Sequence, residues 1–201
     1  MKLEEIGFYT LSDKRAKESS DSSPLWRCEM LVTNRCNFNC PYCRHVGPET
    51  DMSLDDALYV LDLWIADGLK NVRFSGGEPT MWPHLVRAVD HCNRSGVERI
   101  AISTNGSASR EVYDSLLDAG ATDFSISFDA CCADDCDKMS GNRAQWESLR
   151  DTISYLSERT YVTAGVVLTE DNEDTIFDIV QTAQELGFSD IRVIPAAQHA
   201  R

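Results

Sequence analysis

The sequence has no apolar run near the ~18–20 residues that a membrane-spanning helix needs, and its first twenty residues lack the apolar segment of a secretory signal. Gly and Pro are scarce, at 11 and 6 of 201 residues, which excludes collagen-like and low-complexity sequence. Basic residues are outnumbered, with 19 Lys and Arg against 33 Asp and Glu. Because nucleic-acid affinity depends on cationic contacts to phosphate, duplex DNA or RNA is not expected as the main partner. These absences predict a cytoplasmic protein that binds neither membrane nor nucleic acid.

The chain is long enough for one domain with a sizeable core, and too short for two full domains. Residues 1–27 form a polar leader, and residues 28–201 are predicted to form a single domain. The last strand candidate ends a few residues before Arg201. We therefore expect either a minimal domain or the front part of a longer one.

Short β-rich runs alternate with amphipathic helical patterns, which is typical of an α/β protein. Apolar residues recur at helical spacing in 54–65, after a potential N-cap at Ser53, and again in 146–156 and 176–186. The β-rich runs are nearly continuous in apolar residues, as expected for parallel strands covered on both faces. They span residues 28–34, 71–77, 98–106, 122–130, 161–169 and 190–196.

Six β–α repeats joined by right-handed crossovers give a parallel sheet. A complete eight-fold barrel needs roughly 250 residues, so this chain is predicted to form a partial (β/α)6 TIM-like barrel. In such folds, functional residues gather at the carboxyl ends of the strands. The loops that follow each predicted strand are therefore the places to look for chemistry.

Eight cysteines are many for a cytoplasmic chain, and their grouping indicates metal binding or catalysis rather than disulfides. Cys36, Cys40 and Cys43 follow the first predicted strand in a CxxxCxxC spacing. Thiolates are the usual ligands of iron–sulfur clusters, and three of them would leave one iron of a cubane open to a small molecule. The alternative is a structural zinc site, for which His45 is the candidate fourth ligand.

The second predicted strand ends in the sequence SGGEP, residues 75–79. Adjacent glycines let backbone groups approach a ligand closely, and Glu78 places a carboxylate beside them. Alone, this pattern could be an ordinary turn between a strand and a helix. When it follows a CxxxCxxC loop, the pattern is much more specific for a binding site.

Together these motifs resemble the radical S-adenosylmethionine (SAM) superfamily, over about residues 31–195. The three clustered cysteines match the superfamily's cluster-binding motif, and Tyr42 occupies its aromatic position before the last cysteine. Residues 75–79 match the motif that binds the SAM amino group. Residues 104–106, TNG, match the motif of its third strand, and residues 125–129, SISFD, match the SxD pattern of its fourth strand.

The resemblance implies an enzyme that uses a [4Fe-4S] cluster held by Cys36, Cys40 and Cys43. One electron from a flavodoxin or ferredoxin-type donor would cleave SAM reductively, and a hydrogen atom would be abstracted from a peptide or small-molecule substrate. The protein itself would supply positioning and the exclusion of water. The SAM-binding residues that the resemblance implies are Tyr42, Gly76, Gly77, Glu78, Thr104, Asn105, Ser127 and Asp129.

Within the superfamily, the sequence is nearest the branch of molybdenum-cofactor GTP cyclases and peptide-modifying maturases. Arg73 matches a substrate arginine of the cyclases, whereas Glu29 and Thr169 depart from their basic substrate positions. The C-terminal cysteines that both groups use for further clusters are missing, so GTP cyclisation is not expected of this chain. A nucleotide dehydratase of the viperin type shares a histidine at the position of His45, but matches the fourth-strand region poorly.

A second group, Cys131, Cys132 and Cys136, follows the fourth predicted strand. One hypothesis makes Cys136 a catalytic hydrogen donor or part of an auxiliary metal site; the alternative is an ordinary loop with reduced thiols. Two functional classes thus remain, a SAM-cleaving enzyme and a non-catalytic iron–sulfur or zinc protein that acts in redox chemistry or as a scaffold. The complete set of SAM motifs favours the enzyme.

Overall fold

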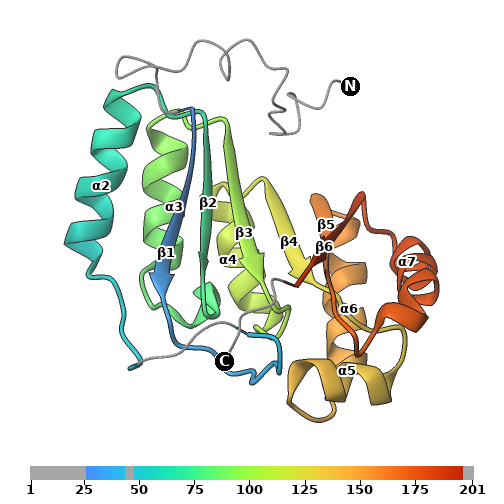
Figure 1. Ribbon diagram of the computed structural model, residues 1–201. Helices are drawn as coiled ribbons and strands as arrows, with labels where there is room; N and C mark the ends of the chain where they lie inside the picture. Colours follow the sequence, from blue (N-terminus) through green and yellow to red (C-terminus); the bar gives the residue numbers. More distant parts are fainter. Residues whose placement is uncertain (1–25, 44–47, 197–201) are drawn as a thin grey trace, which may run out of the picture.

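The computed structural model describes residues 26–43 and 48–196 (Figure 1). His45 and nearly all of the predicted leader lie outside these residues. The strands are β1 (Arg27–Thr33), β2 (Asn71–Gly76), β3 (Arg99–Thr104), β4 (Asp123–Ser127), β5 (Tyr161–Leu168) and β6 (Asp190–Pro195). The helices are α2 (Leu54–Ala66), α3 (Leu85–Arg94), α4 (Arg110–Ala119), α5 (Ala133–Ser140), α6 (Trp146–Ser157) and α7 (Ile176–Glu185), with 3-10 turns η2 (Pro79–Met81) and η3 (Glu173–Thr175).

The six strands form one parallel sheet in the order β1-β2-β3-β4-β5-β6. Each strand pairs with its sequence neighbour, so β1 and β6 remain as two open edges. This confirms the prediction of a partial β/α barrel with parallel strands. Because the strands run in the same direction, their carboxyl ends meet at one edge of the sheet, the lower edge in Figure 1.

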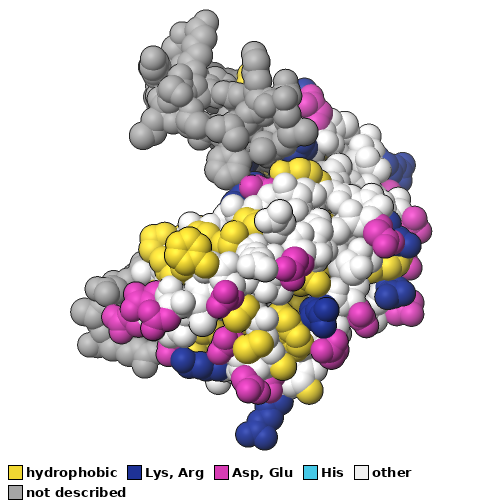
Figure 2. Space-filling model, turned by 90° about the vertical axis from the view of Figure 1, so that its right-hand side faces the viewer, with side chains coloured by type: hydrophobic (Ala, Val, Ile, Leu, Met, Phe, Trp, Pro, Cys, Tyr) yellow, Lys and Arg dark blue, Asp and Glu magenta, His cyan; other side chains and the backbone are white. Residues whose placement is uncertain are grey.

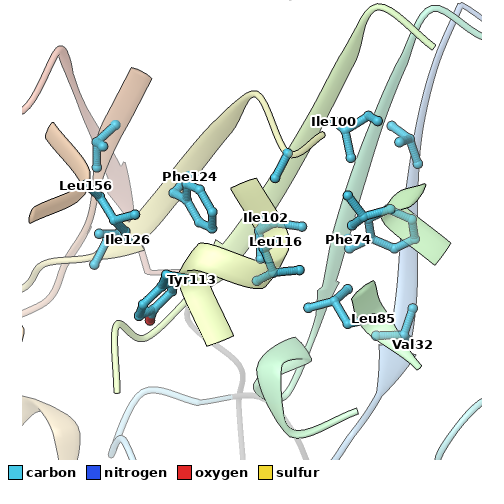
Figure 3. Close-up of a cluster of buried hydrophobic side chains, with 14 of the residues drawn as sticks. Val32, Phe74, Leu85, Ile100, Ile102, Tyr113, Leu116, Phe124, Ile126 and Leu156 are labelled. Carbon is cyan, nitrogen blue, oxygen red and sulfur yellow. The ribbon is translucent and has the colours of Figure 1, made fainter. Parts of the chain in front are cut away.

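The hydrophobic core lies between the helices and one face of the sheet (Figure 3). Phe74, Ile102 and Phe124 belong to neighbouring strands and are fully buried there, where they pack with Tyr113 and Leu116 of α4. Side chains alternate between the two faces of a strand. The residues between these core positions therefore point to the concave face, and the strands are not covered by helices on both sides as the apolar runs had suggested.

The polar composition of the concave face follows from this alternation. Ser75, Ser103, Ser125 and Ser127 all alternate with buried apolar residues, and Arg73 donates a 3.2 Å hydrogen bond to the hydroxyl of Ser103 across β2 and β3. A polar lining at the centre of the sheet suits a ligand rather than a second layer of helices.

Helix boundaries follow the sequence signals. The hydroxyl of Ser53 accepts a 3.1 Å hydrogen bond from the backbone N–H of Asp56, which confirms the predicted N-cap of α2. At the other end of a helix, Gly120 caps α4 in the left-handed conformation with φ 109°, where a side chain would be strained. The patterns of 146–156 and 176–186 are confirmed as α6 and α7.

On the face shown in Figure 2, Lys and Arg side chains of the described residues are dispersed among Asp and Glu. On this face they form no continuous basic surface. Over residues 26–43 and 48–196, no helix combines the length and apolarity required to cross a bilayer.

Candidate functional site

A cavity of about 230 Å³ opens at the carboxyl ends of the strands. Cys36, Cys40 and Cys43 line it together with residues from the ends of β2, β3 and β4. The cavity thus brings together groups that lie almost a hundred residues apart in the sequence. Of the predicted cofactor-binding residues, those that line it are Tyr42, Gly76, Gly77, Thr104, Asn105, Ser127 and Asp129.

The cysteine loop folds back on itself and on the end of α5. The backbone N–H of Cys43 donates to the carbonyl of Cys40 at 3.0 Å, which closes a turn. The backbone N–H of Asn39 donates to the carbonyl of Ser140 at 3.0 Å, and the Cys40 thiol lies 3.7 Å from that same oxygen. These contacts hold the loop in place through its backbone.

Burial disfavours the thiolate forms of Cys36 and Cys40 by raising the pKa of each. The pKa of Cys40 rises to about 11. The neighbouring cysteines act in the same direction, because thiolates close together repel one another. A metal centre that binds here must displace the thiol protons, and its positive charge then offsets the repulsion.

The two glycines after β2 allow a close backbone contact with the loop after β1. The N–H of Gly77 donates to the carbonyl of Thr33 at 2.8 Å, and the N–H of Glu78 donates to the carbonyl of Arg35 at 2.7 Å. A Cβ at Gly77 would lie 2.2 Å from the carbonyl oxygen of Arg35, much closer than real Cβ atoms come. Only glycine therefore fits where the two loops meet.

We predict that Gly77→Ala destabilises the fold, by about 1–3 kcal/mol because the backbone must shift. Gly165→Ala is the matched control, since a Cβ there meets nothing nearer than 3.6 Å. Urea unfolding of the two variants checks the prediction. Equal midpoints for the two variants would contradict it.

Glu78 lies directly behind the cavity and is not one of the residues that line it. Its side chain is fully buried, and its carboxylate accepts four hydrogen bonds. The donors are the N–H and hydroxyl of Thr80, at 3.1 and 2.6 Å, the hydroxyl of Thr104, at 2.8 Å, and the N–H of Asn105, at 2.6 Å. Burial raises the pKa of Glu78, and these donors oppose that shift. Glu78 therefore ties the end of β2 to the end of β3.

Asn105 connects the β3 end to the cysteine loop. Its amide group donates to the side chain of Asn37 at 2.8 Å and lies 3.9 Å from the sulfur of Cys36. Together with the bond from its backbone to Glu78, this places the TNG turn between the SGGEP loop and the first cysteine. Three of the sequence motifs thus form one hydrogen-bonded unit.

Tyr42 and Asp129 close the opposite wall of the cavity. The phenol of Tyr42 donates to the carboxylate of Asp129, which also accepts from the N–H of Val167. Burial raises the pKa of Asp129 to about 6, and the two donors act against this rise. Burial also raises the pKa of Tyr42, so the phenol keeps its proton and serves as a donor.

Apolar side chains that the sequence reasoning did not assign to the site form the rest of the wall. Phe128 and Trp146 stack with ring centroids 6.1 Å apart, and Met139 and Leu149 lie beside them in the lining. Trp146 sits on the apolar stripe of α6, so its spacing indicates a core residue. No signal in the sequence separates it from the core residues of the same stripe.

The structure divides the second cysteine group. Cys136 is buried in the cavity wall, and burial, helped by nearby acidic groups, raises its pKa to about 11. Cys131 and Cys132 do not belong to the lining; their sulfur atoms lie close to the carboxylate of Asp135 instead. The zinc alternative through His45 falls outside the described residues.

The donor set fits an iron–sulfur cluster with a polar organic cofactor beside it. Three thiols from one loop face a cavity whose other walls supply exposed glycine backbone, hydroxyl groups and one carboxylate. Thiolates are the ligands that iron–sulfur clusters take. A parallel β/α sheet with these groups at its carboxyl edge fits the class of domains that would hold an iron–sulfur cluster beside an organic cofactor.

Comparison with known proteins identifies the family. The model of the radical SAM superfamily matches residues 30–183. The chain belongs to the radical SAM superfamily, whose enzymes use a [4Fe-4S] cluster and SAM as cofactors.

Two curated relatives are GTP 3',8-cyclases by name. The GTP 3',8-cyclase of Pseudomonas putida is 31% identical over 181 residues, and the match covers 83% of this chain and 53% of the cyclase. A probable GTP 3',8-cyclase of Saccharolobus solfataricus is 29% identical over 175 residues, and the match covers 85% of this chain and 57% of that cyclase. This chain therefore spans about half the length of these relatives.

Solved structures share the fold. Streptococcus suis SuiB bound to precursor peptide SuiA has a TM-score of 0.77 at 17% identity, covering 92% of this chain and 42% of that chain. SuiB bound to SAM has a TM-score of 0.76 at 17% identity, covering 98% of this chain and 50% of that chain.

Proposed function

We propose that residues 28–201 form the catalytic domain of a radical SAM enzyme, in which Cys36, Cys40 and Cys43 hold the [4Fe-4S] cluster. The observation that carries this proposal is the single cavity in which the three thiols meet the ends of β2, β3 and β4. A structural zinc site needs only ligands, whereas this cavity also has polar groups placed for a second, organic cofactor.

When bound, the cluster and SAM supply the reductive cleavage of SAM and the abstraction of a hydrogen atom from the substrate. The chain's own residues position the two cofactors. Gly76 and Gly77 expose backbone at the cavity surface, and Thr104, Asn105 and Ser127 provide polar groups around it. Asp129 offers a carboxylate that Tyr42 and Val167 hold in place. We propose that these groups contact SAM and that they form one site with the cluster ligands.

Glu78 acts in this proposal as a positioning residue. All four of its hydrogen bonds go to the chain itself, so its carboxylate shapes the backbone of the SGGEP and TNG motifs. The apolar wall of Phe128, Met139 and Leu149 keeps water away from the reacting groups.

The substrate is a peptide or a small molecule, and the concave face favours a polar one. Arg73 shares this face with Ser75 and Ser103, and its Nε atom is buried without a hydrogen-bond partner among the described residues. A substrate that brings an acceptor group to Arg73 would satisfy that atom. The names of the relatives point to GTP as the first compound to test, and the electron donor is proposed to be of the flavodoxin or ferredoxin type.

Anaerobic reconstitution with iron and sulfide, followed by dithionite and SAM, tests the proposal. We expect a brown protein that releases 5′-deoxyadenosine. A colourless protein that holds zinc and leaves SAM intact would instead assign the non-catalytic scaffold. Faster release in the presence of GTP would assign a nucleotide substrate; an unchanged rate would leave a peptide or another small molecule.

A further inference from the structure

Three potential metal ligands lie together outside the cavity, where the loop after β4 enters α5. The sulfur atoms of Cys131 and Cys132 and a carboxylate oxygen of Asp135 all lie within 4.8 Å of one another. The Cys131 thiol is 3.7 Å from that carboxylate. Cys131 and Asp135 are half-buried and Cys132 is exposed, so a metal ion can reach the group from solvent.

The surroundings of this group are negatively charged. The carboxylate of Asp135 lies within the group itself, and Asp134 precedes it on α5. Over residues 26–43 and 48–196, no Lys or Arg pairs with Asp135, and Lys138, one turn further along α5, is paired with Asp171 at 2.9 Å. The group therefore has negative charge that no described cation neutralises.

A disulfide is a poor alternative for these two cysteines. The Cα atoms of consecutive residues are about 3.8 Å apart, below the roughly 4.4–6.8 Å that disulfides span. A metal ion makes no such demand, because Zn–S bonds of about 2.3 Å and Zn–O bonds of about 2.0–2.2 Å need only ligand atoms within reach of one centre. The three ligand atoms already lie within 4.8 Å of one another.

We propose that Cys131, Cys132 and Asp135 form a second metal site, which binds a thiophilic divalent cation such as Zn²⁺. Two thiolates and one carboxylate match the ligand preferences of zinc, and a water molecule would complete the tetrahedron. Cys136 is not part of this site, since it faces the catalytic cavity.

The site's position gives it a structural consequence. Its ligands fix the first turn of α5, and the last residue of α5, Ser140, accepts the hydrogen bond from Asn39 in the cysteine loop. A metal ion bound to the first turn of α5 thus restrains the helix that supports the predicted cluster loop. Metal binding at this second site does not depend on the proposed SAM chemistry.

The test must remove the competing thiols. In a background with Cys36, Cys40 and Cys43 replaced by serine, Co²⁺ is titrated as a spectroscopic probe and Zn²⁺ is then used to displace it. We expect one tightly bound Co²⁺ with sulfur-to-cobalt charge-transfer absorption. Adding Cys131→Ser and Cys132→Ser should abolish the band, and adding Asp135→Asn should weaken binding by at least about 10-fold. Adding Cys28→Ser, on β1, is the control that should leave binding unchanged.

A Co²⁺ band that survives Cys131→Ser with Cys132→Ser, or no thiolate band in the background, would overturn the proposal. Circular dichroism establishes that each variant is folded. If the serine background does not fold, zinc is counted in the cluster-loaded wild-type chain and in its Cys131→Ser, Cys132→Ser variant. Equal zinc contents in those two proteins would likewise overturn the proposal.

Discussion

Replacing Cys36, Cys40 or Cys43 singly by serine is expected to remove the iron–sulfur absorption of the reconstituted protein and abolish 5′-deoxyadenosine formation. A cluster held by three protein ligands loses a third of its protein bonds with each substitution, and the alcohol is far less acidic than a thiol. The loss should therefore exceed the roughly 10–100-fold cost of removing an outer-shell partner. Iron and sulfide content, absorption spectra and product analysis measure the effect.

Cys28→Ser provides the control for the same chemistry. Cys28 is a half-buried thiol on β1 and does not line the cavity, so its replacement should leave cluster content and SAM cleavage unchanged. A full cluster and normal cleavage in any of the three loop variants would contradict the assignment of that cysteine. Loss of the cluster in Cys28→Ser as well would indicate general instability of the fold.

The parallel order of the strands, and the meeting of most of the predicted residues at one edge of the sheet, could be predicted from the sequence. Strands β2 to β4 carry buried residues at alternate positions, as Phe74 and Ile102 illustrate, and each chemical motif lies at the end of a strand or just after it. Because parallel strands bring their carboxyl ends to one edge, motifs such as residues 75–79 and 104–106 had to meet. The convergence of the predicted residues in one cavity follows from topology alone.

Which of the predicted residues line the cavity and which bond only to the chain could not be predicted, because this depends on side-chain contacts. The motif at Glu78 predicts a carboxylate at the cofactor, and only the structure shows that its oxygens accept hydrogen bonds from Thr80, Thr104 and Asn105. Spacing also did not separate Cys136 from Cys132. Cys132 is the N-cap of α5 with an extended backbone, φ −150° and ψ 173°, so it does not share the helical geometry of Cys136.

Glu78→Ala is expected to destabilise the fold strongly. The substitution leaves the buried N–H of Asn105 and the part-buried N–H of Thr80 without their acceptor, and each such loss costs about 1–3 kcal/mol. The Thr104 hydroxyl loses its acceptor as well, although it can rotate toward another. We expect a decrease of about 2–6 kcal/mol in the free energy of unfolding, out of the roughly 5–15 kcal/mol of a typical domain. Urea unfolding measures it.

Glu98→Ala is the control that removes a carboxylate without removing buried hydrogen bonds. Glu98 pairs with Lys70 at 2.7 Å, but its side chain is 64% exposed. Exposed ion pairs contribute only about 0–1 kcal/mol, so the unfolding midpoint should hardly move. A similar loss of stability in the two variants would contradict the view that the hydrogen bonds of Glu78 account for its contribution to the free energy of unfolding.

Glu78→Gln tests whether this residue positions the cofactor site without contacting it. The amide keeps the shape of the side chain and one acceptor oxygen. Its NH₂ group replaces the second oxygen, and because it cannot accept a hydrogen bond, the donors that face it lose their partner. We expect an intermediate loss of stability and weaker SAM binding by the folded, cluster-loaded protein, because the backbones of Gly77 and Asn105 shift. The effect should appear as a higher Kd for SAM at unchanged cluster content. Normal SAM affinity together with reduced stability would show that the network supports the fold and not the site.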